Sequence, residues 1–524
     1  MKTLTKILIC LLTVCMLLPA MASCGKKNKK PSGTNSNGSS SGIGMEDLDA
    51  DIVKPEIVDM NGYVYKAYVR AYAGGDELAE QLEHGNNDYK CIDFWIDEAN
   101  KEQDVISFAV YTRNSRIETD YNCKIRQFAS NGSQVEHLEL SYVNGDRYDL
   151  TIISAKPAAQ AATQNLLRDL NKSTYADLSH ASFDQNSIKE LSIENQLFFI
   201  SGDMNVSTLE IAGLSLVNME FYEDLSDTIV AAFDGDQTYA SIYDVVTTKK
   251  WTMDTMMKIA TMANVDVDTN DGDDLSVIEH DDTIGYHQYL YSTAWYFYSS
   301  GGRITTKNDQ GIPELTIQTE KNQEIVNYIY DHFNSVVKVP WIPRAPSETL
   351  DQNFLTGKLL FMDCSLFEIR TKIYPRSEIE YGILPCPVMD VGQDYCSVLF
   401  FNNWAHLWAI PNLVGDLEKA ERMLQIFAVY SSLSNSTMHA YYDRTVYLNA
   451  ALNNGSRQVL NLIRKSLVYD IALMYNWGGL EDMLISLSYE KTNPYASAVN
   501  GVYDRVNPLI LETINQLGGA SGGN

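Results

Sequence analysis

The stretch YDLTIISAKPAAQAATQNLLRDLNK, residues 148–172, opens on the segment that points most clearly to the fold class. Its first residues, 148–153, form a short segment that is rich in β-branched side chains, which predicts a strand. Working outward, residues 123–127 predict another strand and residues 109–121 a helix. Residues 63–72 alternate aromatic and polar side chains, a pattern typical of a strand.

The same alternation continues toward the C-terminus. Apolar residues recur at helical spacing over 325–333 and over 417–427, where Asp416 is a candidate N-cap. Residues 380–384 and 398–401 predict strands that end at a proline and an asparagine. Because strands alternate with helices and no repeat of 20 to 50 residues is visible, we predict an α/β architecture with mostly parallel sheet.

The net charge of the chain narrows the classes of partner that the protein could bind. The chain of 524 residues carries 40 Lys and Arg against 68 Asp and Glu, a formal net charge of −28. A sequence-independent grip on nucleic acid needs a basic face, so we expect no nucleic-acid partner. The same acidity argues against a protein held on anionic lipid by its folded surface alone.

The N-terminus predicts export and anchoring. Lys2 and Lys6 flank the start of a short apolar run, and small residues follow it, which predicts a signal peptide over residues 1–23. The tail Met-Ala-Ser-Cys at 21–24 resembles a bacterial lipobox, in which the cysteine becomes the lipidated first residue. We therefore expect Cys24 to carry lipid and the protein to sit outside the cytoplasm on the cell membrane, as in Gram-positive bacteria.

Residues 24–50 predict a flexible leash. Four lysines and a Ser/Gly/Asn run follow the cysteine, with no apolar cluster that could build a core. The lysines beside the membrane would each add about 1 kcal/mol of attraction to anionic lipid.

Cysteine and acidic spacings give little sign of metal. None of the five cysteines after Cys24 makes a CxxC motif; we expect free buried thiols, with a Cys386–Cys396 pair as the lesser alternative. In the acidic stretch at 266–274 the calcium-type spacing involves three residues, namely Asp266, Asp268 and Asn270. Its glycine comes one residue late and the closing glutamate is misplaced, so an acidic surface turn and a structural calcium loop both stay open.

Eight further segments carry a resemblance when taken together and in order. They are residues 148–172, LFFISGDMNVS at 197–207, KKWTMDTMMKIA at 249–260, AWYFYSSGGRI at 294–304, FLTGKLLFMDCSLFEI at 354–369, EYGILPCPVMD at 380–390, NNWAHLWAIPN at 402–412 and VYDIALMYNWGGLEDML at 468–484. Behind a lipobox and a linker, this series resembles the extracellular solute-binding proteins of ABC importers, the sugar-binding family that includes maltodextrin-binding proteins.

The resemblance implies a fold and a function. The fold is α/β and two-lobed, of the type II periplasmic-binding-protein kind, with the ligand in a cleft between lobes that close on a hinge. It places one lobe at 55–206 plus 404–460 and the other at 207–403 plus 461–524. The function is capture of a carbohydrate and delivery to separate ABC permease subunits, without catalysis and without a required cofactor.

Sugar chemistry selects the candidate ligand contacts within the resembling segments. Aromatic rings cover the C–H face of a pyranose, and carboxylates, amides and guanidinium groups bind its hydroxyls. The stacking candidates are Trp295, Tyr296, Phe367, Trp404 and Trp477. The polar candidates are Asp203, Asn403, Asp363 and Arg113. A plain core role is the alternative for each aromatic, and a solvated, capping or paired surface group is the alternative for Asp203 and Arg113.

Two other functions are weighed against this one. A surface glycoside hydrolase needs two carboxylates about 5 to 9 Å apart across a cleft, and no recognisable catalytic motif supports it. A helical outer-membrane starch-capture lipoprotein would lack the strands predicted at 148–153 and 380–384.

Overall fold

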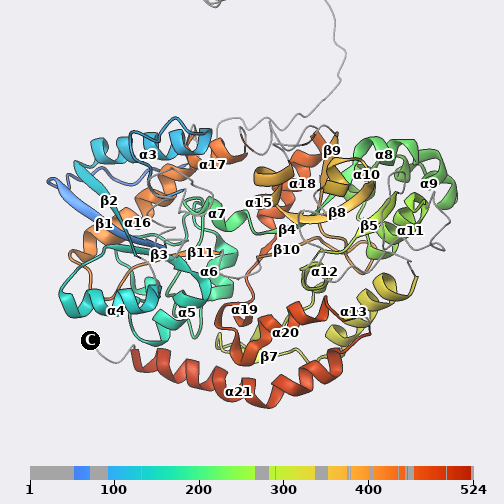
Figure 1. Ribbon diagram of the computed structural model, residues 1–524. Helices are drawn as coiled ribbons and strands as arrows, with labels where there is room; N and C mark the ends of the chain where they lie inside the picture. Colours follow the sequence, from blue (N-terminus) through green and yellow to red (C-terminus); the bar gives the residue numbers. More distant parts are fainter. Residues whose placement is uncertain are drawn as a thin grey trace, which may run out of the picture. The chain divides into compact units, whose positions relative to one another are not determined.

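The chain folds around two separate four-stranded sheets, each flanked by helices (Figure 1). The computed structural model describes residues 52–70, 93–130, 133–265, 283–289, 291–336, 352–373, 377, 379–399, 405–434, 436–442, 445, 454–490 and 492–520. All of them belong to one compact unit, Asp47–Asn524. The predictions for the signal peptide, Cys24 and the linker lie outside the described residues, as do those for Asp266, Asp268, Asn270, Asn403 and Trp404.

The first sheet has the order β11-β3-β1-β2 and confirms the strands predicted around it. Its strands are β1 (Tyr63–Arg70), β2 (Cys123–Ser130), β3 (Leu150–Ser154) and β11 (His406–Ala409). β1 pairs in parallel with both β2 and β3, whereas β11 runs antiparallel to β3. Every residue of β3 is buried, so the strand is covered on both faces.

Helices of the first lobe pack on this sheet. They are α3 (Val105–Asp120), α4 (Gln134–Asn144), α5 (Ala155–Thr163), η1 (Leu170–Lys172), α6 (Gln185–Leu191), α7 (Val206–Leu209), α16 (Leu417–Ser432) and α17 (Thr437–His439). The core between the sheet and α16 is aromatic, with Trp408 and Phe94 both in contact with Phe427 at ring distances of 5.5 and 5.2 Å. The predicted helices at 109–121 and 417–427 are thus confirmed.

The second sheet has the order β5-β8-β4-β9. Its strands are β4 (Gly213–Asn218), β5 (Ile284–His287), β8 (Leu359–Ser365) and β9 (Tyr381–Leu384). The helices around it are α8 (Met219–Asp224), α9 (Ser226–Ala232), η2 (Gln237–Ala240), α10 (Ile242–Thr247), α11 (Met253–Ala263), α12 (Ser292–Ser299), α13 (Glu320–Tyr330), η4 (Asp331–Val336), α15 (Leu366–Glu368), η5 (Ile369–Ile373) and α18 (Asn454–Lys465).

Strand direction departs from the predicted mostly parallel sheet. β5 and β8 are parallel, but β4 is antiparallel to both of its neighbours. β4 and β11 are the first strands that the chain forms after it passes from one lobe to the other. Each enters its sheet from the opposite lobe and therefore runs against the strand that it meets.

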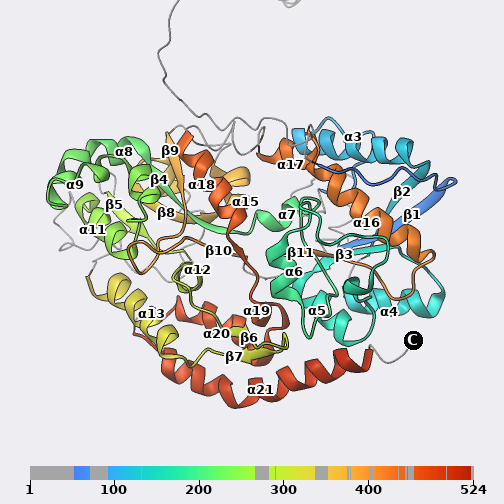
Figure 2. The ribbon, with the colours of Figure 1, turned by 180° about the vertical axis from the view of Figure 1, so that it is seen from behind.

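The C-terminal part of the chain touches both lobes. It holds β12 (Leu467–Val468), paired with β10 (Ser397–Val398), then α19 (Ile471–Tyr475), η8 (Trp477–Gly479), α20 (Leu480–Leu487) and α21 (Tyr495–Ala520). A short hairpin of β6 (Thr305–Lys307) and β7 (Pro313–Leu315) lies beside α21. Both views show α21 running along α13 and α20 of the second lobe and reaching α5 of the first (Figures 1 and 2).

One predicted lobe border is misplaced. We expected residues 404–460 in the first lobe, but α18 packs on β9 of the second sheet. The backbone N–H of Ile383 donates to Ser456 Oγ at 2.9 Å, and Tyr243 makes a hydroxyl contact to the same atom at 2.8 Å. By its contacts the whole helix belongs to the second lobe.

The described residues also show the state of the cysteines and the lengths of the helices. Cys123, Cys364, Cys386 and Cys396 are thiols that are not joined in disulfides, and the first three are buried, which agrees with the favoured prediction of buried thiols. Within the described segments, no helix combines the length and the apolar content that a membrane crossing needs.

Candidate functional site

The parallel strands of both lobes indicate where a ligand would bind. In open α/β sheets the ligand lies outside the carboxyl ends of the strands, because the loops and helix starts there present side chains without disturbing the sheet. Among the strands with such ends are β3, β5 and β8, which end at Ser154, His287 and Ser365. The site is therefore built from the side chains that follow these three residues and from those that face them.

A buried ion pair sits where the chain crosses between lobes. Glu210 lies between α7 and β4 with 4% of its side chain exposed. Arg370 of η5 donates two hydrogen bonds to its carboxylate, from Nε to Oε1 at 2.5 Å and from Nη2 to Oε2 at 3.1 Å. The N–H of Phe367 donates to the Glu210 carbonyl at 2.9 Å, and the guanidinium lies 5.6 Å from the Phe367 ring. A bidentate charge-assisted contact of this kind fixes α15 and η5 against the crossover.

Three aromatic side chains follow β5 and form what we call the aromatic group: Tyr289, Tyr291 and Trp295. Tyr289 and Trp295 stack at 5.6 Å with an interplanar angle of 15°, and Tyr291 tilts against Trp295 at 6.0 Å. The Tyr289 hydroxyl donates to Glu368 Oε1 at 2.6 Å; burial raises the pKa of Tyr289, and the Glu368 charge raises it further. Trp295 packs on the start of β4, where a Cβ on Gly213 would lie 2.4 Å from the indole ring.

The end of β3 is held by an ion pair between lobes. Lys156, in the first turn of α5, pairs with Glu481 of α20. Only 1% of the Glu481 side chain is exposed, and burial raises its pKa to about 7, although the charge of Lys156 acts in the opposite direction. The pair joins the carboxyl end of the first sheet to the C-terminal helices of the second lobe.

A second ion pair between lobes involves a predicted ligand contact. Asp203 pairs with Arg464 at the end of α18 and accepts from Ser432 Oγ at 2.7 Å. The Arg464 guanidinium also lies 5.4 Å from the ring of Tyr442. Asp203, with 16% of its side chain exposed, thus lies at the border of the lobes, and its contact with ligand stays a prediction.

Other predicted residues lie in the core of the second lobe. Tyr296 is fully buried and donates to Asp363 Oδ2 at 2.6 Å, and Asp363 itself is 1% exposed. Trp477 is 4% exposed, and its Nε1 donates to Thr513 Oγ1 of α21 at 2.9 Å. For Asp363 the expected place at a ligand rim is corrected: β8 is buried along nearly its whole length, so the carboxylate faces other core groups.

Arg113 is corrected in the same way. It is 3% exposed in α3, and its guanidinium donates to the carbonyl of Phe94 at 2.8 Å and to Ser431 Oγ at 2.9 Å. Of the predicted ligand contacts that fall within the described residues, Phe367, Trp295 and Asp203 lie near the border of the lobes, and Trp295 is itself buried, with 2% of its surface exposed.

Sequence reasoning missed several members of the site. Tyr289 and Tyr291 stand six and four residues before the predicted contact Trp295, and the helical spacing of Tyr291 was a usable signal. Glu210 and Arg370 are 160 residues apart, so only the folded chain shows that they meet.

Metal chemistry finds no support in the described residues. Within them, no three His, Cys, Asp or Glu side chains are grouped closely enough to hold a metal ion.

Comparisons with known proteins address the fold. No family model matches the chain, and no curated protein matches it. Among solved structures, a cyclo/maltodextrin-binding protein complexed with maltotetraose is 14% identical, with a TM-score of 0.53 over 86% of this chain and 99% of that one. A maltose-binding periplasmic protein from Listeria monocytogenes, in complex with maltose, is 13% identical, with a TM-score of 0.51 over 85% and 98%.

A third comparison agrees with these two. An extracellular solute-binding protein from Staphylococcus aureus, in complex with maltose, is 11% identical, with a TM-score of 0.51 over 85% of this chain and 97% of that one. Identities this low speak for the fold. The chain therefore has the two-lobed α/β fold of the periplasmic-binding-protein kind that these solute-binding proteins share.

Proposed function

We propose that this protein is an extracellular solute-binding protein that captures a carbohydrate between its lobes and delivers it to an ABC importer. The observation that carries the proposal is the shared fold, which matches three proteins solved with maltose or maltotetraose over nearly their whole length. Maltose and maltotetraose are the ligands of those three proteins. The second support for the proposal is the chemistry of this chain's own site.

That chemistry suits a pyranose. The partly buried rings of Tyr289 and Tyr291, which lie against the buried Trp295, offer an apolar surface at low entropic cost. Beside them lie groups that bind hydroxyls, Glu368 next to Tyr289 and the Glu210–Arg370 pair next to Phe367. Flat apolar surface bordered by paired charged groups is the combination that recognises a sugar through its C–H face and its rim of hydroxyls.

Anchoring is a further part of the proposal. Cys24 would carry the lipid and residues 24–50 would form the leash, so that the folded unit stays close to the membrane and to the permease subunits that receive the sugar. The function needs no cofactor; a calcium ion at Asp266, Asp268 and Asn270 would only stabilise its lobe.

The alternatives fare less well. The strands β3 and β9 exclude the helical starch-capture protein. A glycoside hydrolase would need two carboxylates about 5 to 9 Å apart across a cleft, and no recognisable catalytic motif in the sequence supports one.

The proposal is tested on the folded unit, residues 47–524, by thermal shift against mono- and oligosaccharides with and without calcium. A ligand at 100 times its dissociation constant should stabilise the protein by about 2.7 kcal/mol. Stabilisation by one class of sugar, with none of it consumed, is the expected result. No shift with any sugar would overturn the carbohydrate assignment, and consumption of the sugar would favour the hydrolase.

A matched pair of variants locates the site. Tyr291 and Tyr328 are both partly buried tyrosines of the second lobe, but only Tyr291 contacts Trp295; Tyr328 stacks on His332 at 3.9 Å. We expect Tyr291→Ala to weaken sugar binding at least tenfold and Tyr328→Ala to leave it within twofold, as measured by calorimetric titration. Equal losses in both variants would place the ligand elsewhere.

A further inference from the structure

Asp363 is a buried carboxylate held only by hydroxyl groups in the described part of the chain. Its Oδ1 accepts from Ser215 Oγ at 2.6 Å. Its Oδ2 accepts from Tyr286 at 2.7 Å, from Ser292 at 2.5 Å and from Tyr296 at 2.6 Å. No ion pair found among the described residues includes Asp363. Four hydrogen bonds therefore offset the cost of burying its carboxylate, which a cation offsets for most buried carboxylates.

These four donors tie one helix to the sheet. Ser215 is on β4, Tyr286 on β5 and Asp363 on β8, whereas Ser292 and Tyr296 both belong to α12. Because Ser292 and Tyr296 are four residues apart, they lie on the same face of α12 and reach the carboxylate from successive turns. Asp363 is therefore the point at which α12 is fixed to three neighbouring strands.

The same contacts reach the aromatic group. Ser292 Oγ donates to Asp363 and at the same time accepts from the backbone N–H of Tyr289 at 2.8 Å. Through Ser292, the Asp363 carboxylate therefore fixes the segment that precedes α12. Tyr289 belongs to this segment, and its side chain contacts Trp295 and Glu368. Trp295 stands one residue before Tyr296, so any rotation of α12 would carry its ring away from Gly213.

We propose that Asp363 is a positioning residue of the binding site: through Ser292 and Tyr296 it sets the geometry of Tyr289 and Trp295 for ligand. The inference rests on the proposed function and deepens it, because it assigns a role in recognition to a side chain that cannot touch the ligand. A carboxylate that only stabilised the lobe would change the free energy of unfolding and leave the affinity of the folded protein unaltered.

The first lobe offers a matched control. Asp149 is 2% exposed and accepts from the Tyr63 hydroxyl at 2.6 Å and from the N–H of Lys66 at 2.8 Å. It precedes β3 and so lies at the amino end of that strand, away from the carboxyl ends that form the site. Asp149→Asn therefore removes a buried charge of the same kind without disturbing the aromatic group.

The experiment compares Asp363→Asn, Ser292→Ala and Asp149→Asn in the full chain, solubilised in mild detergent. Calorimetric titration measures the affinity for maltose or for whichever panel sugar stabilises the wild type. Hydrogen exchange followed by mass spectrometry measures protection of the peptide that contains Tyr289. We expect Asp363→Asn and Ser292→Ala to weaken binding at least tenfold and to lower that protection, and Asp149→Asn to leave both within twofold.

Each other outcome is decisive. Wild-type affinity in a folded Asp363→Asn variant, or in Ser292→Ala if the first variant does not fold, overturns the inference and leaves the proposed function standing. An equal loss of affinity in Asp149→Asn also overturns it, because the effect would then be general destabilisation. If the wild type binds no sugar, the proposed function fails, and unchanged protection at Tyr289 in Asp363→Asn would overturn the positioning role separately.

Discussion

Arg113 shows how burial alters the role of a single residue. Its guanidinium is enclosed in the first lobe, 5.2 Å from the ring of Phe427, and burial lowers its pKa to about 10 although the charge of Asp93 opposes this. Its hydrogen bonds go to the Phe94 carbonyl, the Ser431 hydroxyl and the Asn114 side-chain oxygen, all of which are core groups. Stability, and not ligand affinity, is the property that this side chain should control.

We expect Arg113→Ala to lower the free energy of unfolding by about 3 kcal/mol, because it removes the buried hydrogen bonds of the guanidinium and opens a cavity. Arg116 is on the same helix with 50% of its side chain exposed, so Arg116→Ala should change stability by no more than about 0.5 kcal/mol. Urea unfolding measures both values. A loss of sugar affinity in Arg113→Ala without loss of stability would restore the predicted ligand contact.

The sequence identified suitable residue types for the site but could not assign their depth. Phe367 and Asp363 are four residues apart in one resembling segment, yet the first lies beside the Glu210–Arg370 pair and the second lies in the core. Alternation tells inward from outward only on a strand with one wet face, and β8 is buried on both. Long-range contacts such as the Lys156–Glu481 pair leave no trace in local sequence at all.

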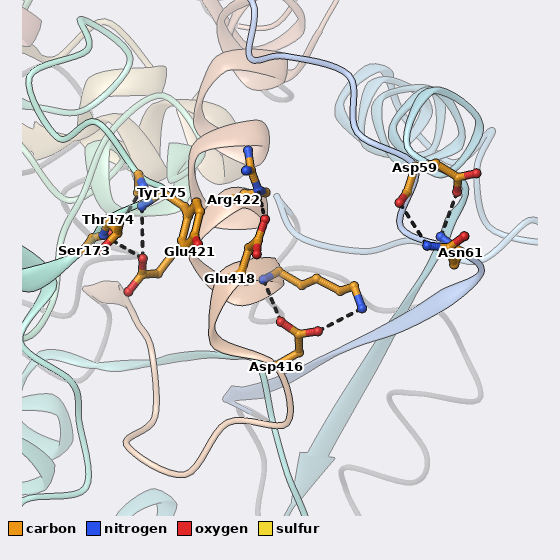
Figure 3. A network of polar contacts seen from close by, with 11 residues as sticks. Asp59, Asn61, Ser173, Thr174, Tyr175, Asp416, Glu418, Glu421 and Arg422 are labelled. Atoms are coloured by element: carbon orange, nitrogen blue, oxygen red, sulfur yellow. Dashed lines mark hydrogen bonds and ion pairs between the residues drawn. The ribbon is translucent and has the colours of Figure 1, made fainter.

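At the scale of elements, the start of α16 follows a local rule. Asp416 accepts from the N–H of Lys419 at 3.2 Å, as the N-cap prediction requires. Figure 3 shows it beside Glu418, which pairs with Arg422 one turn later, and near Glu421, which accepts from two backbone N–H groups of the first lobe. Capping and pairing can be compared here within one helical turn.

We expect Asp416→Ala to cost about 1 kcal/mol of unfolding free energy, the usual value of an N-cap. Glu418→Ala removes an exposed pair of the i,i+4 type and should cost about 0.3 to 0.5 kcal/mol. Thermal or urea unfolding of the two variants under the same conditions gives the comparison. A larger loss for Glu418→Ala than for Asp416→Ala would contradict the capping role.

Elements were predictable where local chemistry decides them. The strands β1, β2, β3 and β9 and the helices α3, α13 and α16 follow from apolar spacing and β-branched runs. The direction of the strands within each sheet could not be predicted, because the directions of β4 and β11 follow from the path of the chain between the lobes. Likewise, α18 joins the second lobe through Ser456, a contact made with a strand 73 residues away.

At the scale of the whole folded unit, two ion pairs between described residues join the lobes: Asp203 with Arg464, and Lys156 with Glu481. The second is the more deeply buried, since only 1% of Glu481 is exposed against 16% of Asp203. A carboxylate buried to this degree is costly to ionise, and its partner returns only part of that cost. The contact between the lobes at the end of β3 therefore depends on whether Glu481 is ionised.

The coupling gives stability a pH dependence whose sign follows from the pKa of Glu481, about 7 in the fold against an ordinary value of 4.5. Since the fold binds this proton more tightly than the unfolded chain does, the contribution is fully present below pH 4.5 and is lost as pH rises through 7. Glu481→Gln stays neutral, so its unfolding free energy should lack this decline, which is on the order of 3 kcal/mol. Urea unfolding of wild type, Glu481→Gln and the exposed neighbour Asp482→Asn between pH 4 and 8 tests this. Asp482→Asn should follow the wild type. Parallel profiles for wild type and Glu481→Gln would show that the buried carboxylate does not titrate in this range, and would contradict the coupling.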